Sequence, residues 1–225
     1  MTGIIIITYN IRHDIFAFQM NKIQQHCTDE FKIIVIDNST ETNQIQEYCE
    51  EYGIEFHKTS AVTTNDSLSH SFAANVSYQL VKDRFDYLFY LDHDCIPVKD
   101  FSVKEILNGN IIAGIAQQKS KLYLWPGCLM IDNDKIDKSL VDFSPSVGLD
   151  TGGELHRIID AYGMNSIGFF DEEICQIPAC DEPMYNYYTM ICKGTFMHFI
   201  NASRWNIVKD NETRLNQLFS IAVVK

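Results

Sequence analysis

The sequence predicts an α/β protein with a mostly parallel, doubly wound sheet. Near-continuous apolar runs at 4–8, 32–36 and 86–91 are typical of parallel strands that are buried on both faces. Stretches with helical spacing of apolar residues lie between these runs, so β-α units follow one another through about the first 100 residues. The 225 residues can form one large core, and we expect a single domain over 1–225 whose two halves meet near residue 100.

Two helices are expected on either side of the second strand. Apolar residues of the first recur at every third or fourth position, which places them on one face; they are Phe16, Met20, Ile23 and Cys27. The second helix covers about 45–52 and ends at Gly53, which can adopt the left-handed conformation of a helix terminus. A short strand is expected at 54–57.

A third helix begins with Asp66 or Ser67 as its N-cap. Its apolar residues step by four, which is typical of a helix; they are Leu68, Phe72, Val76 and Leu80. After residue 100 the pattern loosens into a mixed arrangement: strands at 111–116, 123–131 and 195–199, and a helix at 154–162 ended by Gly163.

Charge and composition exclude several classes of function. The net charge of -12 and the isoelectric point of 4.9 disfavour binding to nucleic acid or to an anionic membrane surface. No apolar run approaches the roughly 20 residues that cross a bilayer, and we expect a soluble, cytoplasmic protein. The seven cysteines include no CxxC pair and favour reduced thiols over a zinc site.

The segment 86–97, DYLFYLDHDCIP, is the most informative motif because an apolar strand runs directly into Asp92-His93-Asp94. Residues i and i+2 of an extended chain point the same way, so both carboxylates can face one point at the carboxyl end of the sheet. Two carboxylates there suit Mg²⁺ or Mn²⁺ held together with substrate phosphates. A solvated Asp-rich turn that caps the strand is the alternative.

Polar residues also follow the first two strands, where Thr8, Tyr9, Asp37 and Ser39 share the same rim as Asp92. These groups are suited to a base and a ribose. Ordinary turn and helix-cap chemistry is the alternative, because such residues favour those positions in any protein.

The order IIIITYN, IIVIDNST, a helix containing Asn75, and YLFYLDHDCIP resembles the nucleotide-binding half of GT-A glycosyltransferases, particularly family 2. The resemblance covers about the first 100 residues. It implies that Thr8, Tyr9 and Asp37 contact the nucleoside. It also implies that Asp92 and Asp94 contact the ribose and a divalent metal on the diphosphate.

The second half is similar to the same family at fewer positions. The segment 122–132, LYLWPGCLMID, resembles a strand with a Gly turn near the sugar and acceptor, at Gly127, and Trp125 either stacks on a sugar or belongs to the core. In 149–163, LDTGGELHRIIDAYG, the family's acidic pair falls on Thr151 and Gly152, so the sequence departs from the pattern where the catalytic base is expected.

Asp150 and Glu154 flank that gap near a helix N-terminus, and either can take the acceptor proton. Asp150 is the preferred base, with an N-cap role as the alternative. By resemblance, His198 in GTFMHFINASRW completes the metal site, although a lone His beside aromatic residues is often structural. Arg204, with Ser203 and Lys209, is a candidate diphosphate contact or merely surface charge.

Together these features predict a metal-dependent glycosyltransferase that moves a sugar from a UDP or GDP sugar to a glycan or other hydroxyl acceptor, inverting by resemblance. The alternative is a non-catalytic nucleotide-sugar or carbohydrate-binding module. A nucleotidyltransferase is less favoured because TYNIRHD offers no Gly-rich phosphate loop, and Walker, GxGxxG and GxSxG motifs are missing. The sequence leaves the sugar, the acceptor and the oligomeric state open.

Overall fold

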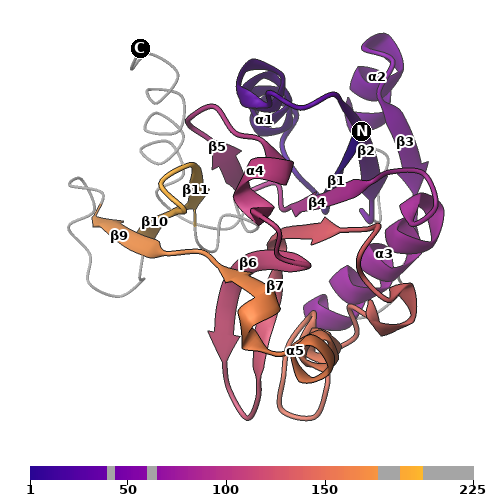
Figure 1. Cartoon of the computed structure of the whole chain (residues 1–225). Helices are drawn as coiled ribbons and strands as arrows, with labels where there is room; N and C mark the ends of the chain where they lie inside the picture. Colours follow the sequence, from indigo (N-terminus) through magenta and orange to yellow (C-terminus); the bar gives the residue numbers. More distant parts are fainter. Residues whose placement is uncertain (40–43, 60–64, 177–187, 200–225) are drawn as a thin grey trace.

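The computed structural model describes residues 1–39, 44–59, 65–176 and 188–199. Within them, two sheets and five α-helices form a layered α/β structure (Figure 1). The larger sheet is seven-stranded, in the order β3 (Glu55–Lys58), β2 (Phe31–Asp37), β1 (Thr2–Thr8), β4 (Tyr87–Leu91), β7 (Leu122–Asp132), β6 (Ile112–Gln118) and β8 (Ile167–Phe169). The predicted α/β class with a mostly parallel sheet is confirmed.

The parallel half of this sheet is built from the three apolar runs. All seven residues of β1 are buried, and β1 pairs in parallel with β2 on one side and β4 on the other. β-Branched side chains fit a strand that is covered on both faces. The carboxyl ends of β1, β2 and β4 therefore lie along one rim of the sheet.

Helices cover both faces of the sheet. Side chains of α1 (His13–His26), α2 (Gln44–Glu51) and α4 (Val103–Leu107) share one apolar cluster with Ile4, Ile6 and Phe89. Side chains of α3 (Asp66–Val81) and α5 (His156–Tyr162) share a second cluster with Ile5, Ile7 and Leu88. The alternation of side chains along each strand separates these two clusters. Gly53, with φ of 64°, ends α2 as predicted.

The predicted N-cap of α3 is wrong. Its N-cap is Asn65, whose side chain accepts a hydrogen bond from the Leu68 amide, rather than Asp66 or Ser67. The apolar residues with a spacing of four form a stripe that is turned outward, since Leu68 and Phe72 are each 49% exposed and Leu80 is 36% exposed. The face that meets the sheet instead consists mainly of small residues with one aromatic ring: Ser69, Ala73, Ala74, Ser77, Tyr78 and Val81. Small side chains let the helix approach the sheet closely.

The second half is mixed, as predicted. β7 runs antiparallel to both β4 and β6, and β6 pairs in parallel with β8. The 3₁₀ turn η2 (Gly153–Leu155) leads into α5, which ends at Gly163 with φ of 76°. The predicted late strand is β11.

A second sheet, which the sequence did not predict, joins the two halves. Its order is β5 (Cys95–Pro97), β11 (Phe196–Phe199), β10 (Tyr188–Cys192) and β9 (Glu172–Gln176), and in Figure 1 it lies beside the main sheet, opposite α3. The antiparallel pairing of β5 with β11 sets His198 opposite Cys95. Through this pairing, β11 at the end of the described chain lies near the carboxyl end of β4.

None of the helices in the described residues combines the length and apolar character that crossing a bilayer requires.

Candidate active site

The centre of the site is a tight turn between β4 and β5. β4 ends at Leu91, and the amide of Cys95 donates to the carbonyl of Asp92 at 2.9 Å. Gln19, a fully buried residue of α1, donates from its Nε2 to the Asp92 carbonyl at 2.7 Å and to the Cys95 carbonyl at 2.9 Å. The turn is therefore held in place from the neighbouring helix as well as from within.

In this turn the two carboxylates have different nearest partners. The expectation that both face one point assumed an extended chain, whereas Asp92 and Asp94 belong to a turn, so the alternation of a strand does not apply. The carboxylate of Asp92 bonds to His70 of α3, and that of Asp94 faces His198 of β11. Each carboxylate thus has its own histidine partner.

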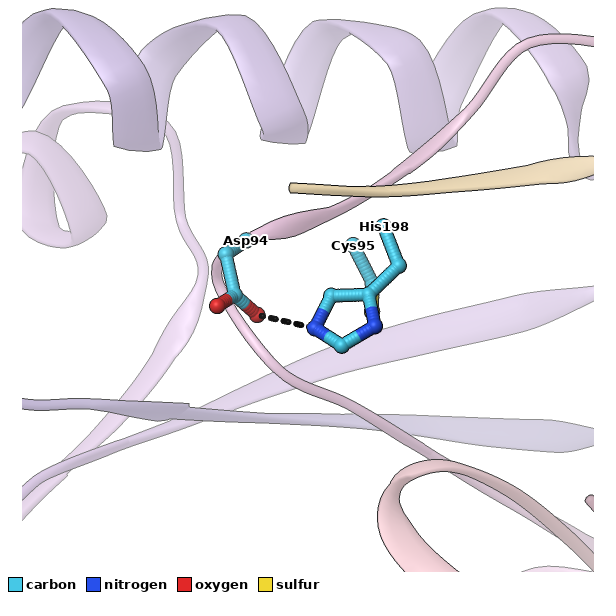
Figure 2. A group of neighbouring side chains, drawn as sticks. All are labelled: Asp94, Cys95 and His198. Carbon is cyan, nitrogen blue, oxygen red and sulfur yellow. Dashed lines mark ion pairs between the residues drawn. The ribbon is translucent and has the colours of Figure 1, made fainter. Parts of the chain in front are cut away.

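Asp94 and His198 form the best candidate metal site in the described residues. Nε2 of His198 lies 3.8 Å from Oδ1 of Asp94, and this Oδ1 is buried without a hydrogen bond. Figure 2 marks the ion pair between the two side chains. A buried carboxylate oxygen without a donor is costly unless a ligand or ion satisfies it. Carboxylate oxygen and imidazole nitrogen are donors that suit Mn²⁺.

Cys95 lies within the same group, whose ligand atoms are all within 4.8 Å of one another. Burial, followed by the nearby Asp94 carboxylate, raises the pKa of the Cys95 thiol well above its ordinary value, which disfavours the thiolate form that binds metals. Asp92, which the sequence assigned to the metal, does not belong to this group.

Asp94 and His198 each stabilise the charged form of the other. Burial acts to raise the pKa of the Asp94 carboxyl, but the His198 ring, with His93, outweighs it and holds that pKa below its usual value. Burial likewise acts to lower the pKa of the His198 ring, but Asp94 and Asp92 outweigh it and raise that pKa. The His198 ring also stacks on Trp125, with ring centroids 4.6 Å apart.

Asp92 is fixed by His70 and by β7. Nε2 of His70 lies 3.0 Å from Oδ1 of Asp92, and the ring donates because a carboxylate only accepts. Burial acts to lower the pKa of His70, but Asp92 outweighs it and the net shift is upward. On the other side, a Cβ on Gly127 would lie 2.6 Å from Oδ2 of Asp92 and 2.1 Å from the Trp125 ring. Gly127 therefore gives the Asp92 carboxylate its space.

The first turns of α3 connect this centre to the candidate bases. Oγ of Ser67 donates to Oδ1 of Asp150 at 3.2 Å, and Oγ1 of Thr151 donates to the Ser67 carbonyl at 3.0 Å. His70 lies one turn further along the same helix. The preferred base Asp150 and the motif residue Asp92 are thus attached to neighbouring turns of one helix.

Asp150 is exposed and carries an ion pair. Nζ of Lys119 lies 2.5 Å from its Oδ2, and this hydrogen bond is the main reason that the pKa of the Asp150 carboxyl is below its usual value. Glu154, in η2, is half-buried, and its amide donates to the Ser144 carbonyl at 3.0 Å. Gly152 is required nearby, because a Cβ there would lie 2.8 Å from Pro126 of β7.

The residues assigned to the nucleoside lie at the ends of β1 and β2. Thr8 and Asp37 are buried, and Oγ1 of Thr8 donates to Oδ1 of Asp37 at 2.9 Å. Ser39 donates to the same oxygen, and Nζ of Lys58 lies 2.6 Å from the other. Tyr9, next to Thr8, is 43% exposed. The structure brings these residues together; Arg204, with Ser203 and Lys209, lies outside the described residues.

The sequence analysis missed the residues that position these groups, namely Gln19, Lys58, His70 and Lys119. Each is a single polar residue on a helix, a strand or a hairpin. Only His70 had a usable signal in the sequence, because it lies on the same helix as Asn75, and the family resemblance includes that helix. Its direction toward Asp92 depends on how the helix packs on the sheet, which the spacing of residues does not give.

Comparison with solved structures identifies the fold. The mannosyltransferase PcManGT from Pyrobaculum calidifontis, solved with GDP-Man and Mn²⁺, aligns over 75% of this chain and 54% of its own, with a TM-score of 0.50 and 9% identity. GalNAc-T7, solved with UDP, GalNAc and Mn²⁺, covers 69% and 39% of the two chains at a TM-score of 0.47 and 12% identity. GlyE from Streptococcus pneumoniae TIGR4 aligns over 76% of this chain and 46% of its own, with a TM-score of 0.46 and 15% identity.

The chain has the GT-A glycosyltransferase fold. It spans about half the length, or less, of these similar structures. The sequence matches no protein-family model and no curated protein sequence.

Proposed function

We propose that this protein is a metal-dependent glycosyltransferase that moves a sugar from a nucleotide-diphosphate sugar to an acceptor hydroxyl. The observation that carries the proposal is the buried Oδ1 of Asp94, which lacks a hydrogen bond and faces His198 at the carboxyl end of β4. In open α/β sheets, ligands bind beyond the carboxyl ends of the strands. A divalent cation there satisfies this oxygen and lets an acidic protein accept an anionic donor.

The donor is a UDP or GDP sugar, and the cation is Mn²⁺ or Mg²⁺. Asp94 and His198 hold the cation, which when bound neutralises the charge that develops on the departing diphosphate. Asp92, fixed by His70, accepts hydrogen bonds from hydroxyls of the donor. Thr8, Tyr9 and Asp37 shape the nucleoside end, and Arg204 contributes to the diphosphate.

Asp150 takes the proton of the acceptor hydroxyl. The acceptor oxygen then forms a bond to the anomeric carbon while the bond from that carbon to the diphosphate breaks, so the products are a glycosylated acceptor and a nucleoside diphosphate. Attack opposite the leaving group makes the transfer inverting. Trp125 and Gly127 lie on the sugar and acceptor side, and Glu154 is the alternative base.

A binding module without catalysis is the second candidate. The ion pair between Asp150 and Lys119 favours it, because a carboxylate tied to a lysine is a weaker base. The lack of an acidic pair at Thr151 and Gly152 points the same way.

The five described cysteines, all free thiols, support action in a reducing compartment such as the cytoplasm; they are Cys27, Cys49, Cys95, Cys128 and Cys192. We propose that the chain acts in that compartment. We also propose that it forms one domain over 1–225 and does not bind nucleic acid.

Incubation with a panel of UDP and GDP sugars, each with Mn²⁺, Mg²⁺ or EDTA, tests the proposal. Release of free nucleoside diphosphate from one donor, dependent on the cation and lost in Asp94→Asn, is the expected result. If donor sugars bind with a divalent ion but are never turned over, with or without glycan acceptors, the protein is the binding module.

A further inference from the structure

The outward face of α3 borders a groove that the proposed reaction does not use. The groove is a cavity of about 960 Å³ between α3 and the chain at 138–145. Leu68, Phe72 and Val76 line its α3 side, and these belong to the apolar stripe that the fold leaves outside the core. The volume is at the upper end of the usual range for small-molecule sites and accommodates more than one sugar ring.

One end of the groove lies near residues that contact the two candidate bases. Leu68 follows Ser67, which donates its hydroxyl hydrogen bond to Asp150. Ser144, which also lines the groove, accepts the amide hydrogen bond of Glu154. A molecule lying along α3 therefore has its end beside the group that would deprotonate an acceptor.

The groove is amphipathic rather than uniformly apolar. Apolar side chains lie between amide, hydroxyl and carboxylate groups, among them Asn75, Gln79 and Asp142. Sugar rings present apolar C–H faces together with hydroxyl edges, whereas an acyl chain would leave these polar groups without partners. The chemistry of the lining favours a carbohydrate.

The charges of the groove favour an uncharged glycan. Nζ of Lys138 lies 2.8 Å from Asp83, and Nζ of Lys82 donates to Gln79 at 2.6 Å. Lys138 is thus paired with a carboxylate, and Lys82 is held by a neutral amide of its own helix. An anionic acceptor would in addition meet Asp142 and the overall charge of -12.

We infer that this groove binds the remote rings of an uncharged oligosaccharide acceptor, with Phe72 as the ring on which a sugar stacks. The inference rests on the proposed function, since it places the acceptor's reacting end beside Asp150. It assigns a length requirement to the acceptor: an oligosaccharide that reaches Phe72 binds more tightly than a single sugar.

The test compares Phe72→Ser with Leu80→Ser. Phe72 lines the groove and Leu80 does not, although both are exposed residues of the same helical stripe, so neither change affects the face that packs on the sheet. Calorimetry measures the binding of cello-, malto- and chito-oligosaccharides of increasing length. Maltose and dodecyl maltoside form the second arm, which reports on an acyl chain.

One oligosaccharide series should gain about tenfold in affinity from one ring to three, and Phe72→Ser should remove this gain while Leu80→Ser keeps it. Equal affinity for all lengths, no binding in any series, or an unchanged gain in Phe72→Ser would overturn the inference. A gain that appears only with dodecyl maltoside would show a lipid site and would overturn it too.

Donor turnover without acceptor separates this inference from the proposed function. The parent protein and Leu80→Ser, whose residue does not line the groove, should release nucleoside diphosphate from the donor at the same rate. Release without any dependence of binding on glycan length rejects the groove alone. Length-dependent binding in a parent protein that turns over no donor keeps the groove as a carbohydrate site and rejects the transferase.

Discussion

His70 and Asp92 are joined across the site by a hydrogen bond of 3.0 Å, although they belong to α3 and to the end of β4. Ser67, one turn earlier on α3, bonds to Asp150. The first turns of α3 therefore set the spacing between the motif carboxylate and the preferred base. α3 therefore positions residues of the site in addition to packing on one face of the sheet.

The first prediction concerns this contact. His70→Ala should weaken the binding of the nucleotide sugar by about tenfold, because Asp92 loses the donor that fixes its carboxylate. His70→Gln should restore most of the affinity, since its Nε2 also donates. The measurement is calorimetric titration of each variant with the donor found in the screen. Equal affinity in parent and alanine variant would mean that His70 does not position Asp92.

The second prediction concerns the clamp on the turn. Gln19→Leu leaves the Asp92 and Cys95 carbonyls without their side-chain donor, and should lower the free energy of unfolding by about 1–3 kcal/mol. It should also weaken Mn²⁺ binding, because the turn carries Asp94. Denaturant unfolding and metal titration provide the two measurements. Gln24→Leu, an exposed change on the same helix, is the control and should alter neither.

The sequence predicted the fold well where burial alone determines structure. The central residues of β1 and β2 and the whole of β4 are apolar because both faces of the sheet are covered, and no long-range information is needed to see it. α3 was predicted as a helix, but its orientation was not, since its bulky residues Leu68 and Phe72 face outward while serines and alanines face inward. A period of four marks one face of a helix without saying whether that face meets the sheet.

The site was predicted in part. Asp92 and Asp94 were found from the motif, but their different partners depend on a turn that has no distinct pattern. The approach of His198 to Asp94 depends on the pairing of β5 with β11, two short strands far apart in sequence. Such pairing is set by the whole fold, and His198 was identified through family resemblance rather than from local residues.

The third prediction identifies the base by pH. Because the Lys119 hydrogen bond lowers the pKa of Asp150, Asp150 stays ionised to lower pH than an ordinary aspartate. Lys119→Met removes that bond, so the pKa rises and the acidic limb of the kcat profile should move to higher pH. Asp150→Asn should lower kcat with donor affinity nearly unchanged.

Glu154→Gln is the matched comparison for this assignment. Loss of turnover in Glu154→Gln, with parent activity in Asp150→Asn and an unmoved acidic limb in Lys119→Met, would transfer the role of base to Glu154. Steady-state rates between mild acid and neutral pH decide between the two residues.

The fourth prediction concerns stability away from the site. Arg84 binds both carboxylate oxygens of Glu55, at 2.7 and 2.5 Å, and this hydrogen bonding, together with His57, lowers the pKa of Glu55 from 4.5 to about 2. Because the pKa of Glu55 is lower in the folded than in the unfolded protein, the ionised carboxylate stabilises the fold at pH values above the unfolded pKa. This stabilisation is lost as the pH falls from about 4.5 toward 2. Glu55→Gln should therefore have a lower Tm than the parent at neutral pH.

That difference in Tm should shrink steadily as the pH is lowered through this range. Glu47→Gln, an exposed change on α2, is the control and should follow the parent at each pH. A difference that stays constant down to the lowest pH would show that the pair does not contribute through ionisation.

The most direct test of the central claim is the binding of Mn²⁺, followed by electron paramagnetic resonance in the presence of UDP or GDP. The parent should bind Mn²⁺ together with one of the two nucleotides, and EDTA should weaken nucleotide affinity by at least about tenfold. Asp94→Asn and His198→Ala should each weaken Mn²⁺ binding, while Cys95→Ala should leave it unchanged. If the parent binds neither nucleotide more tightly with Mn²⁺ than with EDTA, Asp94 and His198 are not a metal site and the account is contradicted.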